Sequence, residues 1–325
     1  MLLAGDIGGT KTLLGLFEPA PGRPRAVSDR TFATLQYPDL SAIIAEFTST
    51  LPDRHGAIDR ACFGVAGPVI NNTAALTNVP WRLEARGIAD RFGFERVDLL
   101  NDLQSMAYGV TVLQPSEVHV LQEGEAAPDG NVGLIAAGTG LGMAMLQRVK
   151  GRLVPAPSEG GHADFSARND REIDLLRWLI AKHGRAEVEA VVSGRGLLNI
   201  HRIAHVEPCR VVVSLDHPDA AAAITAAALG HQCTGCRETL DMFVDAYGAE
   251  AGNLALRTVS TAGLCIGGGI APKILPALTD GRFMRAFRSK PPFEALLSAM
   301  PVKVILNPEI GLLGAAVYAS MNVEV

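Results

Sequence analysis

Apolar residues occur along the chain in short runs that end on glycine, proline or a polar pair. Residues 2–17 contain two such runs joined by a glycine turn at 5–10, which predicts a strand, a turn and a second strand. Residues 132–146 repeat this pattern around a turn at 138–142. We interpret the two units as a weak internal duplication, with one hairpin in each of two lobes.

The remaining elements are predicted by the same criteria. Apolar runs bounded by turn residues predict strands at 61–65, 97–100 and 259–266. Apolar residues at helical spacing predict helices at 41–51, 88–92, 172–180, 220–247 and 308–321. Because strands alternate with helices throughout, we expect an α/β fold.

Composition adds the scale of the fold. The chain has 325 residues, of which 48% are hydrophobic and 19% are charged. This length fits two domains or one large one, and the composition supports a sizeable core. No low-complexity linker divides the chain, so we infer a lobe boundary near residue 105.

Charge and hydropathy exclude several classes of protein. The net charge is −5, and lysine and arginine are scattered, which argues against a nucleic-acid binder. No run of about 18 apolar residues occurs, so we expect no membrane span. Asp6 interrupts the apolar start and no basic segment precedes it, so we expect no signal peptide and a cytoplasmic location.

The five cysteines are widely spaced and odd in number, which does not predict a disulfide framework. Cys233 and Cys236 form a lone Cys-x-x-Cys motif. It could be a redox pair or half of a zinc site, but no second ligand pair has matching spacing. We favour two reduced cysteines on a helix.

The first glycine turn suits a nucleotide phosphate. Glycines let backbone N–H groups approach phosphate oxygens, Thr10 adds a hydroxyl donor and Lys11 adds charge. The Asp6 carboxylate would repel a phosphate that carries no cation. We therefore expect Asp6 to bind Mg²⁺, through a water molecule. An ordinary hairpin turn with an acidic edge is the alternative, and the sequence matches neither a Walker A loop nor G-x-G-x-x-G.

Two further glycine sites favour the nucleotide hypothesis. Gly138-Thr139-Gly140 offers a second close backbone approach, and two opposed hairpins can clamp a triphosphate between two lobes. Gly267-Gly268-Gly269 lies between a predicted strand and a predicted helix, where a flat adenosine can lie against backbone. Tight strand–helix packing is the alternative at the second of these sites.

Polar residues at two other positions suit a sugar. Asn101 and Asp102 follow a buried strand; Asp102 could accept a hydroxyl proton, and Asn101 could bind a sugar hydroxyl. A strand-end Asx turn is the alternative. Glu159 and His162, with two glycines between them, could hold vicinal hydroxyls or be half of a metal site, and Glu189 could add a carboxylate or be an exposed helix residue.

Taken in order, these motifs resemble those of bacterial glucokinases, within the hexokinase and actin-like ATPase superfamily and related to the repressor, open-reading-frame and kinase (ROK) group of sugar kinases. The motifs that match span almost the whole chain: 5–10 (GDIGGT), 77–81 (TNVPW), 100–102 (LND), 138–142 (GTGLG), 159–162 (EGGH), 193–197 (SGRGL), 267–270 (GGGI) and 311–316 (GLLGAA).

The resemblance implies a two-lobed actin-like ATPase fold (ribonuclease H-like) with a central cleft. Residues 1–105 and about 306–325 would form a small lobe and residues 106–305 a large one. The implied reaction transfers the γ-phosphoryl group of Mg-ATP to the 6-hydroxyl of D-glucose in a cytoplasmic enzyme, commonly a homodimer, with no nucleic-acid or membrane partner. Alternatives are a kinase for mannose, fructose or N-acetylmannosamine, a ROK-type regulator and a non-catalytic sugar binder.

The resemblance also implies residue roles. Asp102 would be the catalytic base and Asp6 would hold Mg²⁺ through water. The residues implied to bind the sugar are Asn78, Asn101, Asp102, Glu159, His162 and Glu189. The residues implied to bind ATP are Gly5, Asp6, Ile7, Gly8, Gly9, Thr10, Gly138, Thr139, Gly140, Gly268 and Gly269.

Some positions depart from the family pattern. Lys11-Thr12 resembles the wider ROK group, Arg195 stands where proline is common, and Ser158 stands where glycine is common, which puts the sugar preference in question. Zinc-containing ROK kinases have a cysteine cluster shortly after the EGGH loop. No cysteine occurs here between His162 and Cys209, so we expect no structural zinc. A ROK regulator would need a helix-turn-helix before the phosphate turn, which begins at residue 5.

Overall fold

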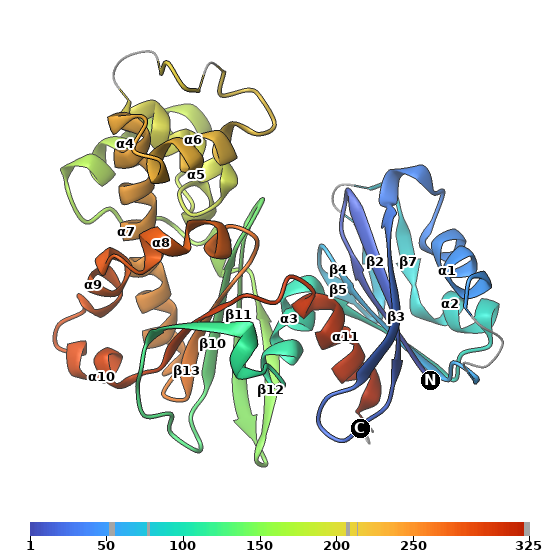
Figure 1. Ribbon diagram of the computed structural model, residues 1–325. Coiled ribbons are helices and arrows are strands. Elements are labelled where there is room, and N and C mark those ends of the chain that lie inside the picture. The colour runs from blue at the N-terminus through green and yellow to red at the C-terminus, as the bar shows by residue number, and fades with distance from the viewer. Residues whose placement is uncertain (52–55, 77–78, 206–208, 213, 322–325) are drawn as a thin grey trace. The chain divides into compact units, whose positions relative to one another are not determined.

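The computed structural model describes residues 1–51, 56–76, 79–205, 209–212 and 214–321 (Figure 1). The chain divides into two compact units. Unit 1 is Met1–Gln114 with Asn307–Val325, and unit 2 is Pro115–Leu306. Each unit has its own sheet and its own hydrophobic core.

A five-stranded sheet forms the centre of unit 1, in the order β3-β2-β1-β4-β8. Its strands are β1 (Leu2–Ile7), β2 (Lys11–Glu18), β3 (Arg25–Ala33), β4 (Arg60–Val65) and β8 (Arg96–Asn101). The predicted strand–turn–strand unit at 2–17 is confirmed by the antiparallel pair β1 and β2. β1, β4 and β8 are parallel, so their carboxyl ends meet at one edge of the sheet.

Helices cover both faces of this sheet. Successive strand residues point to opposite faces, so Leu3 and Ile7 contact the α1 side while Asp6 points to the α11 side. The helices are α1 (Leu40–Ser49), α2 (Ala85–Phe92), α3 (Asp102–Val110) and α11 (Ile310–Ser320), with a 3₁₀ turn η1 (Thr34–Gln36). A small separate sheet contains β5 (Val69–Ile70), β6 (Thr73–Ala75) and β7 (Arg82–Glu84).

The last helix packs against α3, and glycines allow the close approach (Figure 1). A Cβ atom on Gly314 would lie 1.7 Å from the backbone oxygen of Ser105, and one on Gly109 would lie 2.5 Å from that of Ile310. Ser105 also donates a hydrogen bond from its hydroxyl to the Gly311 carbonyl at 2.8 Å. The boundary predicted near residue 105 therefore falls inside α3, and unit 1 continues to Gln114.

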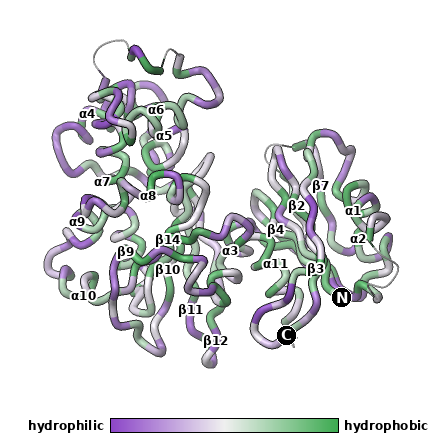
Figure 2. Tube along the Cα trace, viewed as in Figure 1, coloured by the Kyte–Doolittle hydropathy of each residue, from purple (hydrophilic) through white to green (hydrophobic). Residues whose placement is uncertain are grey.

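Unit 2 is built on a six-stranded sheet in the order β12-β11-β10-β13-β14-β9. Its strands are β9 (Val118–Gln122), β10 (Val132–Ala137), β11 (Leu141–Val149), β12 (Arg152–Ser158), β13 (Gly263–Gly267) and β14 (Val302–Ile305). β10 is antiparallel to β11, which confirms the second predicted hairpin, and parallel to β13. The central strands of both sheets are mostly apolar (Figure 2).

Seven α-helices accompany this sheet among the residues described. They are α4 (Asp170–His183), α5 (Gly194–Ala204), α6 (Ala220–Leu229), α7 (Thr234–Thr258), α8 (Leu275–Leu278), α9 (Arg282–Arg288) and α10 (Glu294–Ala299). The 3₁₀ turns are η2 (Pro115–Glu117), η3 (Gly160–His162), η4 (Val188–Ala190) and η5 (Ala271–Ile274).

Two predicted element bounds in unit 2 are wrong. The single helix predicted at 220–247 is two helices, because α6 ends at Gly230 and His231 adopts a positive φ of 54° before α7 begins. The strand predicted at 259–266 begins at Gly263, because α7 continues to Thr258 and Val259, with φ 46°, ends it.

The central helix of unit 2 is α7, with 25 residues. Its buried Phe243 and Tyr247 pack against each other with ring centroids 5.8 Å apart, and Tyr247 packs against Phe283 of α9 at 5.6 Å. Gly248 permits this contact, since a Cβ there would lie 2.3 Å from the Phe283 oxygen. Across the described part of the chain, neither α7 nor any other helix is both long enough and apolar enough to cross a membrane.

Candidate active site

Two carboxylates meet at the carboxyl edge of the unit 1 sheet. Asp6 is the next-to-last residue of β1, and Asp102 follows β8 directly as the first residue of α3. Both residues lie at the carboxyl ends of parallel strands, and the charge of Asp102 contributes to the raised pKa of Asp6. Rigid strand ends therefore bring together two of the residues that the sequence singled out.

The surroundings of Asp6 disfavour its charge. Burial, and then the charge of Asp102, raise the pKa of Asp6 to about 6, although Lys11 acts in the opposite direction. Gly311 of α11 leaves room for this side chain, since a Cβ there would lie 2.8 Å from Asp6 Oδ2. A divalent cation would relieve the repulsion between the two carboxylates, so these residues fit Mg²⁺.

The glycine turn between β1 and β2 is braced by two threonines that the sequence analysis did not identify. The Gly8 N–H donates to the Lys11 carbonyl at 2.9 Å, and the Thr34 hydroxyl donates to the Gly8 carbonyl at 2.9 Å. The hydroxyls of Thr12 and Thr34 are 2.9 Å apart. Thr10 is exposed at the tip of the turn, where it can reach a ligand.

Gly5 and Ile7, both implied to bind ATP, lie inside β1. Ile7 is fully buried, and a Cβ on Gly5 would lie 2.6 Å from Phe63 and 2.8 Å from Leu14. Core packing therefore accounts for glycine at position 5. An ATP contact at these two positions stays a prediction.

Asn101 caps α3. Its side-chain oxygen accepts from the N–H groups of Leu103 and Gln104 at 3.0 and 3.4 Å, and its amide donates to the Gly67 carbonyl at 3.2 Å. The Leu103 N–H also donates to Asp102 Oδ1 at 2.8 Å. The Asx turn weighed for this pair is therefore present, and it fixes the side chain of Asp102 at a helix N-terminus.

The second and third glycine sites meet at one edge of the unit 2 sheet. Gly138 follows β10, and Gly268 follows its parallel neighbour β13. Gly268 has φ +83°, and a Cβ there would lie 2.3 Å from the Ala137 oxygen, so only glycine fits. The tight packing weighed at Gly268 is therefore present. Gly269 is open, because none of the described atoms lies within 4 Å of the place that a Cβ would take.

The EGGH loop lies against the start of β11. A Cβ on Gly161 would lie 2.1 Å from the Leu141 oxygen, so glycine lets the loop approach the strand. The Ser158 hydroxyl accepts from the Gly160 N–H at 3.1 Å. Glu159 and His162 remain exposed on this loop.

Three further side chains complete this cluster. His162 Nδ1 is 3.0 Å from Glu187 Oε2, and this hydrogen bond raises the pKa of His162. Glu189 Oε2 accepts from the Leu141 N–H at 2.9 Å, which places the carboxylate against the second glycine turn. Arg195 lies 3.2 Å from both Glu187 and Glu189. Unit 2 thus brings together Glu189, His162 and the 138–140 turn.

Sequence reasoning missed Glu187 and the pairing of Arg195. Glu187 lies 25 residues from His162, so no local pattern connects them. Arg195 was noted as a departure, but its partners become visible only when η4 and α5 are folded. Asn78, implied to bind the sugar, lies outside the described residues.

Comparison with known proteins identifies the family of this chain. The Glucokinase family profile matches residues 3–322. The chain belongs to the glucokinase family. A curated glucokinase of Nostoc punctiforme is 39% identical over 98% of this chain and 99% of that protein, and a glucokinase of Cronobacter sakazakii is 32% identical over 97% and 96%.

A solved structure has the same fold as this glucokinase-family chain. The crystal structure of glucokinase from an Antarctic psychrotroph is 30% identical, with a TM-score of 0.86, and the match covers 98% of both chains. A ROK family glucokinase of Streptomyces griseus, in complex with glucose and AMPPNP, is 22% identical with a TM-score of 0.65, over 98% of both chains. The α/β class predicted from strand–helix alternation is confirmed.

Proposed function

We propose that this chain is an ATP-dependent glucokinase, which transfers the γ-phosphoryl group of ATP to the 6-hydroxyl of D-glucose. The observation that supports this most strongly is the full-length match to glucokinases, combined with a carboxylate, Asp102, directly after a strand at the sheet edge. We assign the chain to the hexokinase and actin-like ATPase superfamily.

Asp102 is the proposed catalytic base. The glucose 6-hydroxyl oxygen attacks the γ-phosphorus in line, the bond from phosphorus to the β-phosphate oxygen breaks, ADP leaves, and Asp102 accepts the hydroxyl proton. The Leu103 N–H on Oδ1 orients this carboxylate at the N-terminus of α3.

Asp6 and the two glycine turns are proposed to bind the nucleotide. Mg²⁺, when bound, offsets the charge of the phosphates, and Asp6 would hold it through water. The N–H groups of Gly8 and Gly138 donate within their own turns, to the Lys11 and Gly140 carbonyls. The other backbone N–H groups of the two turns are therefore the ones proposed to contact the phosphates, and Gly268 and Gly269 are proposed to border the adenosine.

The proposed ligands of the glucose hydroxyls in unit 2 are Glu159, His162 and Glu189. Asn101 is proposed to bind a further hydroxyl through its second amide N–H, because the first donates to the Gly67 carbonyl. We further propose that glucose binding is followed by a closure that excludes water from the reacting groups. The cytoplasmic location and the homodimer stay predictions.

Release of ADP, measured with glucose, mannose, fructose and N-acetylmannosamine, tests this function. We expect kcat/KM to be highest for glucose, with ATP as the donor. Turnover of another sugar with glucose inert would overturn the substrate, and no ADP release with any of the four would overturn the kinase assignment.

A further inference from the structure

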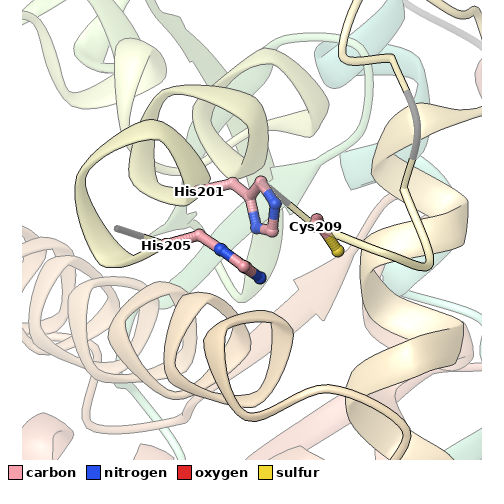
Figure 3. A group of neighbouring side chains, drawn as sticks. All are labelled: His201, His205 and Cys209. Atoms are coloured by element: carbon pink, nitrogen blue, oxygen red, sulfur yellow. The ribbon is translucent and has the colours of Figure 1, made fainter. Parts of the chain in front are cut away.

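A cluster of histidine and cysteine side chains lies in unit 2, among residues to which the proposed reaction gives no role. Its members are His201 and His205 on and after the last turn of α5, Cys209, and Cys233 and Cys236 at the start of α7. Figure 3 shows the rings of His201 and His205 side by side, with Cys209 next to them. No disulfide joins the cysteines.

The spacing of these side chains is that of a tetrahedral ligand shell. The Cys209 sulfur is 3.9 Å from the Cys233 sulfur and 3.7 Å from the Cys236 sulfur, and His205 Nε2 is 3.2 Å from the Cys233 sulfur. With Zn–S bonds of about 2.3 Å, a tetrahedron separates two sulfurs by about 3.8 Å. A disulfide would need about 2.05 Å.

We propose that this cluster is a structural Zn²⁺ site whose ligands are the thiolates of Cys209, Cys233 and Cys236 and the Nε2 atom of His205. Four protein ligands close the coordination shell, so the ion would stabilise the fold rather than catalyse a reaction. His201 is not needed as a ligand, because its Nδ1 is 2.9 Å from the Thr239 hydroxyl.

The local backbone is shaped around these ligands. Gly235 lies between the two cysteines of the motif, and a Cβ there would lie 2.2 Å from His205 Cδ2, so the ring packs directly on the turn. The Val212 N–H lies 3.3 Å from the Cys209 sulfur, and the Cys236 N–H lies 3.5 Å from the Cys233 sulfur. N–H groups at this position, and the N-terminus of α7, favour the thiolate that zinc binds.

The proposal replaces two expectations from the sequence. The absence of cysteines after the EGGH loop argued against structural zinc, and the Cys233–Cys236 motif had no second ligand pair of matching spacing. The structure supplies that pair as His205 and Cys209, which are 28 and 24 residues before Cys233. Packing of α5 and α6 on α7 brings the pairs together.

The site would fasten the end of α5 to the start of α7. α5 begins at Gly194, directly after the segment with Glu189, and includes Arg195. Because binding of the ion is coupled to folding of its ligands, its removal would lower the stability of unit 2.

Metal analysis of the purified full-length protein, grown with added Zn²⁺, tests the proposal. We expect about one zinc per chain, and a zinc X-ray absorption spectrum with three sulfur neighbours and one nitrogen neighbour. Cys233→Ala and Cys236→Ala should each lower the zinc content about tenfold or more. Cys265→Ala is the matched control, because Cys265 is a buried cysteine of β13 outside the cluster, and it should retain the zinc.

Several results would overturn the proposal. Wild-type protein with no zinc after incubation with ZnCl₂ would do so, as would a thiol titration in denaturant that finds three free thiols instead of the five in the sequence. If the cysteine variants fail to fold, the wild-type spectrum decides, and a shell of oxygen and nitrogen only would contradict the assignment. Loss of zinc in His201→Asn but not in His205→Asn would overturn the histidine ligand.

Discussion

Asp102 and Asp6 lie at one edge of the unit 1 sheet, but their surroundings differ. Asp102 lies at the start of α3, where the Leu103 N–H donates to it. Asp6 lies beneath α11 next to Gly311, and its pKa is raised to about 6. Asp102, the proposed base, is therefore held by a backbone N–H, whereas Asp6 needs a nearby cation to keep its charge.

Asp102→Asn tests the base. The amide keeps the shape of the side chain but cannot accept the hydroxyl proton, so we expect kcat to fall about 10²-fold or more, while glucose binding changes little. Steady-state kinetics and glucose titration by calorimetry measure the two effects. Asp90→Asn, on the exposed side of α2, is the control. An unchanged kcat in the Asp102 variant would exclude this residue as the base.

Asp6→Asn tests whether the buried charge of Asp6 destabilises the fold. The folded-state pKa is about 6 against an ordinary value of 3.8, so the contribution of Asp6 to stability is present at low pH and is lost as the pH rises through about 6. At about pH 8 the variant should be more stable by up to about 3 kcal/mol without ligands, with a higher KM for Mg-ATP. Urea unfolding at about pH 4 and pH 8 checks this.

The stabilisation should disappear at about pH 4, where wild-type Asp6 is already protonated. Equal stabilisation at both pH values would show that another interaction, not the charge of Asp6, is responsible.

Arg195→Ala tests the departure from the family pattern. Arg195 neutralises Glu187 and Glu189, but its side chain is 57% exposed, so its loss should change the free energy of glucose binding by no more than about 1 kcal/mol. We expect KM for glucose to rise about threefold to fivefold with little change in kcat. Arg177→Ala, which removes an exposed pair with Asp174, should change neither constant.

At this scale, the sequence could point to candidate residues only where the pattern is local. Asp102, the EGGH loop and the turn at 138–140 could be singled out from their immediate neighbours. Glu187, Thr34 and the His205–Cys209 pair could not, because their partners lie 22 to 28 residues away and only folding brings them together.

At the scale of elements, α3 and α11 support the sheet edge at which Asp102, the proposed base, lies. α3 begins with Asp102, and its other residues contact α11 through Ser105 and Gly109. The position of the base therefore depends on how closely two helices approach one another.

Gly314→Ala tests this dependence. The added Cβ would lie 1.7 Å from the Ser105 carbonyl oxygen, which is backbone and cannot move alone. We expect the unfolding free energy to fall by about 1–3 kcal/mol and kcat to fall with it. Gly87→Ala in α2 meets no described atom within 4 Å, and it should be neutral or stabilising by about 0.5–1 kcal/mol. Denaturant unfolding compares the two variants.

Periodicity predicted the two hairpins and several other helices and strands, but it did not predict β3, α3 or α5, and it did not place the ends of α6 and α7. The break between α6 and α7 depends on His231 in the left-handed conformation, which is uncommon for residues other than glycine. The end of α7 depends on Val259, a β-branched residue in the same conformation. Tertiary packing overrode local preference at both points.

At the scale of the whole molecule, the proposed closure around glucose predicts a measurable change in size. A compact chain of this length has a radius of gyration of about 20 Å. We expect solution scattering to show a decrease of about 1 Å when glucose is added at saturation. An unchanged radius with bound glucose would contradict closure and leave the chemical assignment of Asp102 to the kinetic test.

The chain leaves unit 1 after Gln114 and returns to it at Asn307. During synthesis on the ribosome, all of unit 2 is therefore made before α11. Unit 1, most of which is made before unit 2, stays without the helix that covers β1 and β4 until α11 has left the exit tunnel. The lobe that is translated first should consequently be the one that matures last, and its exposed apolar face is the natural target of a chaperone that acts on nascent chains.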